Sequence, residues 1–211
     1  MDYGSRSRQG EQARFATQYF ANMVAGGPSL DVNRFDPDRD AKAADEKTAA
    51  ALNATEANLK AFQSRGGKLI LYHGWSDAAI APENTINYYQ SVVGAMGQKQ
   101  ADGFVRLFMA PGMQHCFLDP GPNSFGQLAP ATPADTQHDI SLALEQWVEK
   151  GIAPDSIIAT KYKSDFNPAG GVARTRPLCA YPKVARWNGK GSVDEAANFT
   201  CAAEAAAPNL R

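Results

Sequence analysis

The sequence predicts an α/β fold with a mostly parallel sheet flanked by helices. Two short runs, 69–72 and 104–110, are almost wholly apolar, as expected of strands that are buried on both faces. Between them, residues 82–96 repeat apolar side chains at helical spacing, and a second helical pattern follows the second run. Strands that alternate with helices along a chain are typical of βαβ units, whose strands are parallel.

The composition is that of an ordinary globular protein of about one domain. The 211 residues are 44% hydrophobic and 20% charged, and the formal net charge is −1. Such a balance gives no electrostatic basis for binding nucleic acid or an anionic membrane. No apolar run approaches the roughly 20 residues that span a bilayer, and residues 1–8 lack the apolar core of a signal peptide. We therefore expect no nucleic-acid partner and no membrane partner.

Helices are expected in the first part of the chain. Residues 11–24 place three large apolar side chains on one helical face, and Gly26-Gly27-Pro28 predicts the end of that helix. The alanine-rich stretch 41–52 predicts a second helix. Between them, Asp36, Asp38 and Asp40 imitate the start of a calcium loop. The sixth position is alanine rather than glycine and the twelfth is lysine rather than glutamate, so we expect a solvated loop and no metal site.

Capping residues set the boundaries that we expect further along. Pro82 suits the first position of a helix, and Gly97 suits its end. Residues 132–135, Thr-Pro-Ala-Asp, resemble a capping box that opens a helix whose buried face would hold Ile140, Leu144, Trp147 and Val148. Residues 156–162 predict an edge strand, and the rest of the chain, rich in proline, glycine and arginine, is expected to be loop.

Two reactive side chains follow the two apolar runs. Asp77 lies in the polar turn after the first run, and His115 lies in the loop after the second. Right-handed crossovers lay successive strands of a βαβ unit parallel, so both loops should lie at one edge of the sheet. An aspartate beside a histidine is the orienting half of a nucleophilic triad, in which the other ring nitrogen takes the proton of the nucleophile. Without that pairing, Asp77 would be a turn residue bonded to its own backbone, and His115 would bond a backbone carbonyl.

The nucleophile that such a pair needs is not evident. In α/β-hydrolases the triad runs Ser, Asp or Glu, His along the chain, yet no Gly-x-Ser-x-Gly occurs between Met1 and Gly67. Residues 74–78, Gly-Trp-Ser-Asp-Ala, have the outline of a nucleophile elbow. An elbow requires a helix that begins almost at the serine, whereas the helical pattern here begins at Pro82. Ser76 is therefore the less favoured candidate.

The remaining histidines and neighbours of the site have simpler explanations. His73, at the end of the first strand, is expected to be a core histidine with satisfied ring nitrogens, and a place in the lining of the site is the less favoured alternative. His138 is expected to be solvated on the polar side of a helix. Trp75 would pack under the loop or wall an aromatic pocket. Glu83 suits the positive end of the helix dipole.

The three cysteines are divided between two regions. Cys179 and Cys201 lie close together in the tail, and a bridge between them would close about 23 residues and contribute roughly 3 kcal/mol. Cys116 stands apart beside His115. One internal disulfide and one thiol without a partner indicate an oxidising compartment.

Several stretches together resemble the C-terminal half of the tannase and feruloyl esterase family. The resemblance runs from about Phe35 to Cys201 and rests on residues 52–55, 67–82, 109–116 and 176–182. It implies an α/β-hydrolase fold that cleaves carboxylic esters of aromatic acids through a Ser-Asp-His triad, without a redox cofactor or catalytic metal. By this resemblance Asp77 is the triad acid, His115 is its base, and Cys116 bridges to a cysteine before the nucleophilic serine. Cys179 and Cys201 correspond to a C-terminal disulfide.

The resemblance also implies which parts these 211 residues do not contain. The nucleophile motif, the oxyanion-hole loop and nearly all of the lid with its calcium site have no counterpart here. Residues 1–35 correspond to a lid-return or linker segment, and residues 36–211 to the C-terminal part of the catalytic domain. The expected function is a secreted or periplasmic serine esterase whose serine and lid come from an upstream N-terminal half. The alternative is a non-catalytic, truncated or isolated domain that self-associates through an open sheet edge.

Overall fold

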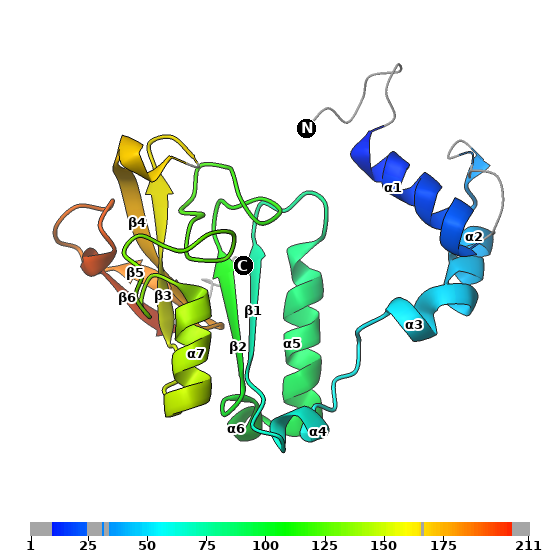
Figure 1. Cartoon of the computed structure of the whole chain (residues 1–211), viewed down its shortest axis with the longest axis horizontal. Coiled ribbons are helices and arrows are strands. Elements are labelled where there is room, and N and C mark those ends of the chain that lie inside the picture. The colour runs from blue at the N-terminus through cyan, green and yellow to red at the C-terminus, as the bar shows by residue number, and fades with distance from the viewer. Residues whose placement is uncertain (1–9, 25–30, 32–33, 166, 204–211) are drawn as a thin grey trace, which may run out of the picture. The chain divides into compact units, whose positions relative to one another are not determined.

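The structure is a computed structural model that describes residues 10–24, 31, 34–165 and 167–203 (Figure 1). The chain divides into two compact units, Met1–Glu56 and Ala57–Arg211. The predicted boundary near residue 35 lies inside the first unit, and the assignment of residues 1–35 to a lid return stays a prediction.

The first unit is helical. Its elements are α1 (Glu11–Tyr19), the π-helical turn η1 (Phe20–Val24), α2 (Pro37–Ala44), a second π-helical turn η3 (Asp45–Ala49) and α3 (Ala50–Leu52). The glycine stop expected at residues 26–28 lies outside the described residues. The acidic segment is not the loop that we expected, because Asp36 caps α2 by accepting hydrogen bonds from the backbone N–H groups of Asp38 and Arg39. Acidic side chains in a first helical turn stabilise it, which explains this difference.

A parallel strand pair lies at the centre of the second unit. The strands β1 (Leu69–Gly74) and β2 (Val105–Ala110) pair in register from Leu69 with Val105 to Gly74 with Ala110. Between them run α5 (Pro82–Met96) and the short helix α6 (Gln98–Ala101), and α4 (Lys60–Gln63) precedes β1. Pro82 begins α5 and Gly97 ends it with φ of 82°, as predicted. The expected parallel crossover is therefore present.

The side chains of β2 alternate between two hydrophobic clusters, one on each face of the strand pair. Val105, Leu107 and Met109 pack with the buried face of α5. Phe108 and Ala110 pack with α7 (Ile140–Lys150) and β3 (Ser156–Tyr162). Figure 1 shows α5 and α7 on either side of the pair. Burial on both faces explains the unbroken apolar runs in the sequence.

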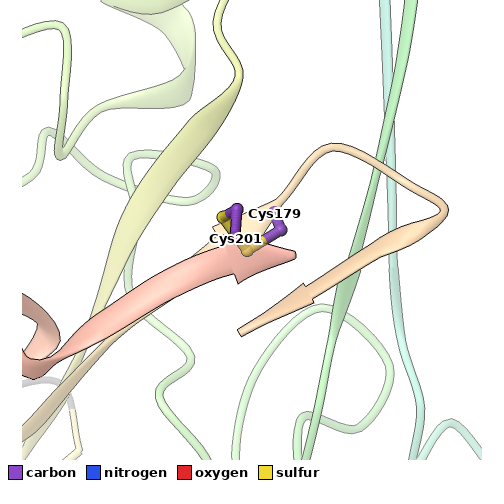
Figure 2. Close-up of a disulfide and its surroundings, with 2 residues drawn as sticks. All are labelled: Cys179 and Cys201. Atoms are coloured by element: carbon purple, nitrogen blue, oxygen red, sulfur yellow. A yellow bond between two sulfur atoms is a disulfide. The ribbon is translucent and has the colours of Figure 1, made fainter. Parts of the chain in front are cut away.

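The tail contains strands where the sequence predicted loop. The strand β4 (Val172–Cys179) pairs antiparallel with β3, and β5 (Lys183–Trp187) pairs antiparallel with β6 (Phe199–Ala203). A disulfide joins Cys179 on β4 to Cys201 on β6, as expected (Figure 2). The guanidinium of Arg176 stacks 3.8 Å from the ring centroid of Phe199. Long-range partners thus order a segment whose composition alone favours loop.

The helix α7 begins later than predicted. Asp139, not Thr132, is its N-cap, with a carboxylate that accepts from the backbone of Ser141 and Leu142. The helix buries Ile140, Ala143 and Trp147, and it leaves Val148 exposed. Within the described ranges, no helix is long and apolar enough to cross a membrane.

Candidate active site

The two loops with the predicted site residues lie side by side at the carboxyl edge of the parallel pair. Where β1 ends, the backbone N–H of Trp75 donates to the carbonyl of Ala110 at 3.0 Å. The N–H of Ser76 donates to the carbonyl of Met113, also at 3.0 Å. Backbone hydrogen bonds therefore tie the loop after β1 to the end of β2 and the loop that follows it.

Gly74 permits this close approach. A Cβ atom at this position would collide with the carbonyl oxygens of Met113 and Gln114. Only glycine lets the backbones of the two loops meet so closely. The last residue of β1 therefore helps to set the position of His115, which follows Gln114 directly.

The Asp77 side chain is held in a tight turn. It is 3% exposed, and its Oδ1 atom accepts hydrogen bonds from the backbone N–H groups of Ala79 at 2.8 Å and Ile80 at 2.9 Å. This is the turn-forming role that aspartate commonly takes. Because both backbone bonds use Oδ1, the Oδ2 atom remains for other partners.

His115 is one of those partners. Its Nδ1 atom lies 2.7 Å from Oδ2 of Asp77, as the order of strands and loops predicted. An ionised carboxylate only accepts hydrogen bonds, so Nδ1 of His115 carries the proton, and in the neutral ring Nε2 has a free lone pair. The side chain is 52% exposed, and no described residue hydrogen-bonds Nε2. This arrangement is suited to a general base.

Hydrogen bonds keep the Asp77 carboxylate charged. Burial alone would raise its pKa, but the hydrogen bonds from the backbone of Ile80, from His115 and from the backbone of Ala79 outweigh burial and hold the pKa below its usual range. Asp77 is therefore an anion at neutral pH, as required of a residue that orients and stabilises an imidazolium.

His73 is a second histidine on Asp77, which the sequence favoured as a core histidine and placed in the site only as an alternative. Its Nε2 atom lies 3.1 Å from Oδ2 of Asp77 and 3.2 Å from the carbonyl oxygen of Ile80. Its Nδ1 atom lies 2.7 Å from the hydroxyl of Thr85, in the first turn of α5. The ring nitrogens are satisfied, as expected. A histidine at a strand end, just before an acid-bearing turn, is the pattern that could have indicated this contact.

The loop beyond His115 has an unusual backbone. Cys116, Leu118 and Asp119 have φ values of 71°, 64° and 74°, in the left-handed region that such residues seldom adopt. The side-chain amide of Gln127 donates to the carbonyl of Cys116 at 3.1 Å, and Lys161 donates to that of Asp119 at 2.7 Å. Cys116 is a free cysteine in this structure.

The remaining candidates lie elsewhere or lack the necessary geometry. Ser76 lies in a turn, α5 begins six positions later at Pro82, and no hydrogen bond joins the Ser76 hydroxyl to His115 among the described residues. His138 precedes α7 and donates to Asp135 at 2.8 Å, so its predicted place on the helix is wrong. Trp75 is exposed and lines a small cavity, whereas Glu83 is exposed in the first turn of α5.

A cavity is lined in part by the loop that follows the candidate base in the sequence. It measures about 230 Å³, and its lining begins two residues after His115. The walls are largely apolar and include Phe117, Leu118, Leu128 and Tyr162. In the part of the chain that the structure describes, no three His, Cys, Asp or Glu side chains gather as a metal site would require.

Known proteins resemble the chain over most of its length. It is 44% identical over 216 aligned positions to an esterase of Xanthomonas campestris pv. campestris, which covers 91% of the chain and 37% of that protein. It is 46% identical over 150 positions to a mono(2-hydroxyethyl) terephthalate hydrolase of Piscinibacter sakaiensis, which covers 71% of the chain and 22% of that protein. The crystal structure of feruloyl esterase B from Aspergillus oryzae superposes with a TM-score of 0.77 at 31% identity, over 88% of the chain and 36% of that structure.

The extent of these matches settles the classification. The chain spans little more than a third, or less, of the length of these relatives. The sequence profile of tannase and feruloyl esterase matches residues 3–202. The α/β-hydrolase type of fold predicted from the sequence agrees with these structures. The chain belongs to the tannase and feruloyl esterase family, whose members are ester hydrolases.

Proposed function

We propose that this chain supplies the acid and the base of a serine carboxylesterase that hydrolyses esters of aromatic acids. The observation that carries the proposal is the hydrogen bond between Asp77 Oδ2 and His115 Nδ1, which leaves Nε2 of His115 exposed. The serine, on this proposal, is supplied by upstream sequence that corresponds to the rest of the longer relatives.

The two residues have separate tasks in the reaction. Nε2 of His115 takes the proton of the serine hydroxyl as the serine oxygen bonds to the ester carbonyl carbon. The charged Asp77 stabilises the imidazolium formed in this step. His115 then gives the proton to the departing alcohol oxygen as the ester bond breaks, which leaves an acyl-enzyme. A water molecule then attacks the acyl carbon while His115 takes its proton. His115 returns this proton to the serine oxygen as the acyl–serine bond breaks, which releases the acid and restores the serine hydroxyl.

Aromatic acyl groups are the substrate class that we favour. The relatives include proteins named for feruloyl and terephthalate esters. The cavity of about 230 Å³, whose lining begins two residues after His115, has the aromatic and aliphatic walls, Phe117, Leu118 and Tyr162, that such a ring would contact.

An upstream half is the partner that we propose for the chain. Relatives are about three times as long, and Cys116 is a free cysteine beside the base. We propose that Cys116 forms a disulfide with a cysteine near the nucleophile and so fixes His115 relative to the serine. A disulfide between Cys179 and Cys201 supports an oxidising location, and we propose secretion or export to a periplasm.

The test is a chimera in which this chain replaces the matching segment of the Xanthomonas campestris esterase. We expect hydrolysis of a chromogenic aromatic ester, with kcat lowered about 10⁴-fold by Asp77→Asn through the wrong histidine tautomer. The matched control is Asp135→Asn, which removes the carboxylate of the other aspartate–histidine contact and should leave kcat unchanged. Equal activity in the two variants would contradict the proposed roles. Activity of the isolated chain that depends on Ser76 would make Ser76 the nucleophile.

A second candidate is a non-catalytic domain that self-associates. The observation in its favour is the edge of β1, which pairs with β2 on one side and with no described strand on the other. An unpaired edge offers backbone hydrogen bonds to a second copy. Light scattering after gel filtration measures whether the isolated chain forms a dimer. A stable dimer of the chain, together with an inactive chimera, would favour the non-catalytic role.

A further inference from the structure

Two imidazoles share one oxygen of Asp77. Oδ2 lies 2.7 Å from Nδ1 of His115 and 3.1 Å from Nε2 of His73. The proton transfers proposed above use only His115 and Asp77, so His73 has no part in them. Its side chain is 11% exposed, and it is held by contacts at both ring nitrogens. A buried second histidine on the catalytic carboxylate therefore needs an explanation of its own.

The partners of His73 determine which of its nitrogens carries the proton. Nε2 faces two atoms that only accept hydrogen bonds, Oδ2 of Asp77 and the carbonyl oxygen of Ile80. Nε2 must therefore carry a proton. The neutral ring then has a lone pair at Nδ1, which accepts from the hydroxyl of Thr85 at 2.7 Å. The two acceptors at Nε2 thus select the Nε2–H tautomer, the Thr85 hydroxyl complements it by donating to Nδ1, and His73 donates to the carboxylate.

Counting acceptor sites shows what this donation does. A carboxylate has about four lone-pair sites, two on each oxygen. The backbone N–H groups of Ala79 and Ile80 occupy those of Oδ1. His73 occupies one site of Oδ2, which leaves one for His115. With three of its four sites filled by fixed donors, the carboxylate has a single orientation in which to receive the proton of His115.

We propose that His73, held as the Nε2–H tautomer by the two acceptors at Nε2, is a positioning residue that orients Oδ2 of Asp77 toward Nδ1 of His115. The proposal rests on the function proposed above, because orientation matters for catalysis only if His115 is the base. The geometric part concerns this chain alone and is testable without any activity.

The chain has three histidines, so its ring signals are few enough to assign by NMR. Long-range proton–nitrogen spectra report which nitrogen of each ring is protonated. In the unmodified chain we expect His73 as Nε2–H and His115 as Nδ1–H. A His73 ring protonated at Nδ1 alone would overturn the proposal at once.

Two substitutions at His73 separate positioning from packing. His73→Gln places an amide N–H near the former Nε2 and keeps a donor to Asp77. His73→Asn places its amide near the former Nδ1 and leaves Oδ2 without that donor. We expect His115 to remain Nδ1–H with Gln and to become a mixture of both tautomers with Asn. The ring signals of His138, which contacts Asp135 instead, should be unchanged and show that each variant is folded.

Each outcome decides the question. If His115 stays in the Nδ1–H form in both variants, the positioning role is overturned. It is also overturned if His115 loses that form equally in both variants while the His138 signals are unchanged. Neither result bears on the chimera, where the Asp77→Asn effect tests the proposed function. If the chimera is inactive but the His115 tautomer differs between His73→Gln and His73→Asn as expected, the positioning role stands and the proposed function is refuted.

Discussion

The chain contains two aspartate–histidine contacts of nearly equal length, and only one has the form of a catalytic pair. His115 lies 2.7 Å from Asp77, and His138 lies 2.8 Å from Asp135. In the first contact the carboxylate is buried and the imidazole is 52% exposed. In the second contact the carboxylate is 47% exposed and the imidazole only 21%. The carboxylate is therefore the more buried partner in the first contact, and the imidazole is the more buried partner in the second.

The use of the carboxylate oxygens differs as well. Both aspartates form turns in which Oδ1 accepts two backbone N–H groups. Asp135 directs the same Oδ1 at His138, three residues away, so its contact is part of one local turn. Asp77 instead uses Oδ2 for its histidine contacts, one of them with His115, 38 residues away on another loop. A short Asp–His distance alone does not identify a catalytic site. A buried carboxylate combined with a solvent-exposed ring nitrogen on its histidine partner does.

The largest effect should follow from separating the two loops. Gly74→Ala would push a methyl group into the carbonyls of Met113 and Gln114, and we expect a loss of about 1–3 kcal/mol in the free energy of unfolding. Because the Asp77–His115 contact joins these two loops and the Asp135–His138 contact does not, NMR should show His115 freed from Asp77 and His138 unaffected.

Gly94 provides the matched control for this substitution. It lies exposed within α5, and a Cβ atom there meets nothing within 4 Å. Gly94→Ala should therefore stabilise the chain by about 0.5–1 kcal/mol, because alanine loses less backbone freedom in a helix. Urea unfolding measures both variants, and a Gly74→Ala chain as stable as the original would refute the required close approach.

The sequence predicted the long-range contact but not its full setting. The apolar runs and helix caps fixed β1, α5 and β2, and right-handed crossover then placed Asp77 near His115. The contact of His73 with Asp77 was only the less favoured alternative, because it depends on a turn that brings Asp77 back toward the strand end. The register of β3 with β4 was missed for a related reason. The proline and arginine residues of β4 hide the alternation of apolar and polar side chains that would predict a strand. This segment is ordered by its pairing with β3, which the local sequence does not reveal.

Acid should weaken the Asp77 contact more than the Asp135 contact. The pKa of Asp77 in the folded chain lies below its unfolded value of about 4, so the stabilisation is complete above that value and is lost as the pH falls through the folded pKa. Asp77→Asn places an amide donor against two imidazoles, and we expect a loss of about 1–3 kcal/mol near pH 7.

The difference between Asp77→Asn and the original chain should shrink as the pH falls below 4. Urea unfolding from pH 7 to pH 3 gives this difference directly. For the exposed Asp135, Asp135→Asn should change stability by about 0.5 kcal/mol or less at every pH. If the difference in the free energy of unfolding between Asp77→Asn and the original chain stays constant with pH, the charge of Asp77 contributes nothing to stability.

The smallest effect should come from the local contact itself. The hydrogen bond from His138 is the main cause of the lowered pKa of Asp135, but nearly half of that carboxylate faces water, which screens the interaction. His138→Gln should therefore change the free energy of unfolding by about 0.5 kcal/mol or less and leave the ring signals of His73 and His115 unchanged. A larger loss, or a shift of the His115 signals, would show that the turn at Asp135 is coupled to the candidate site. The catalytic interpretation would then have to include the start of α7.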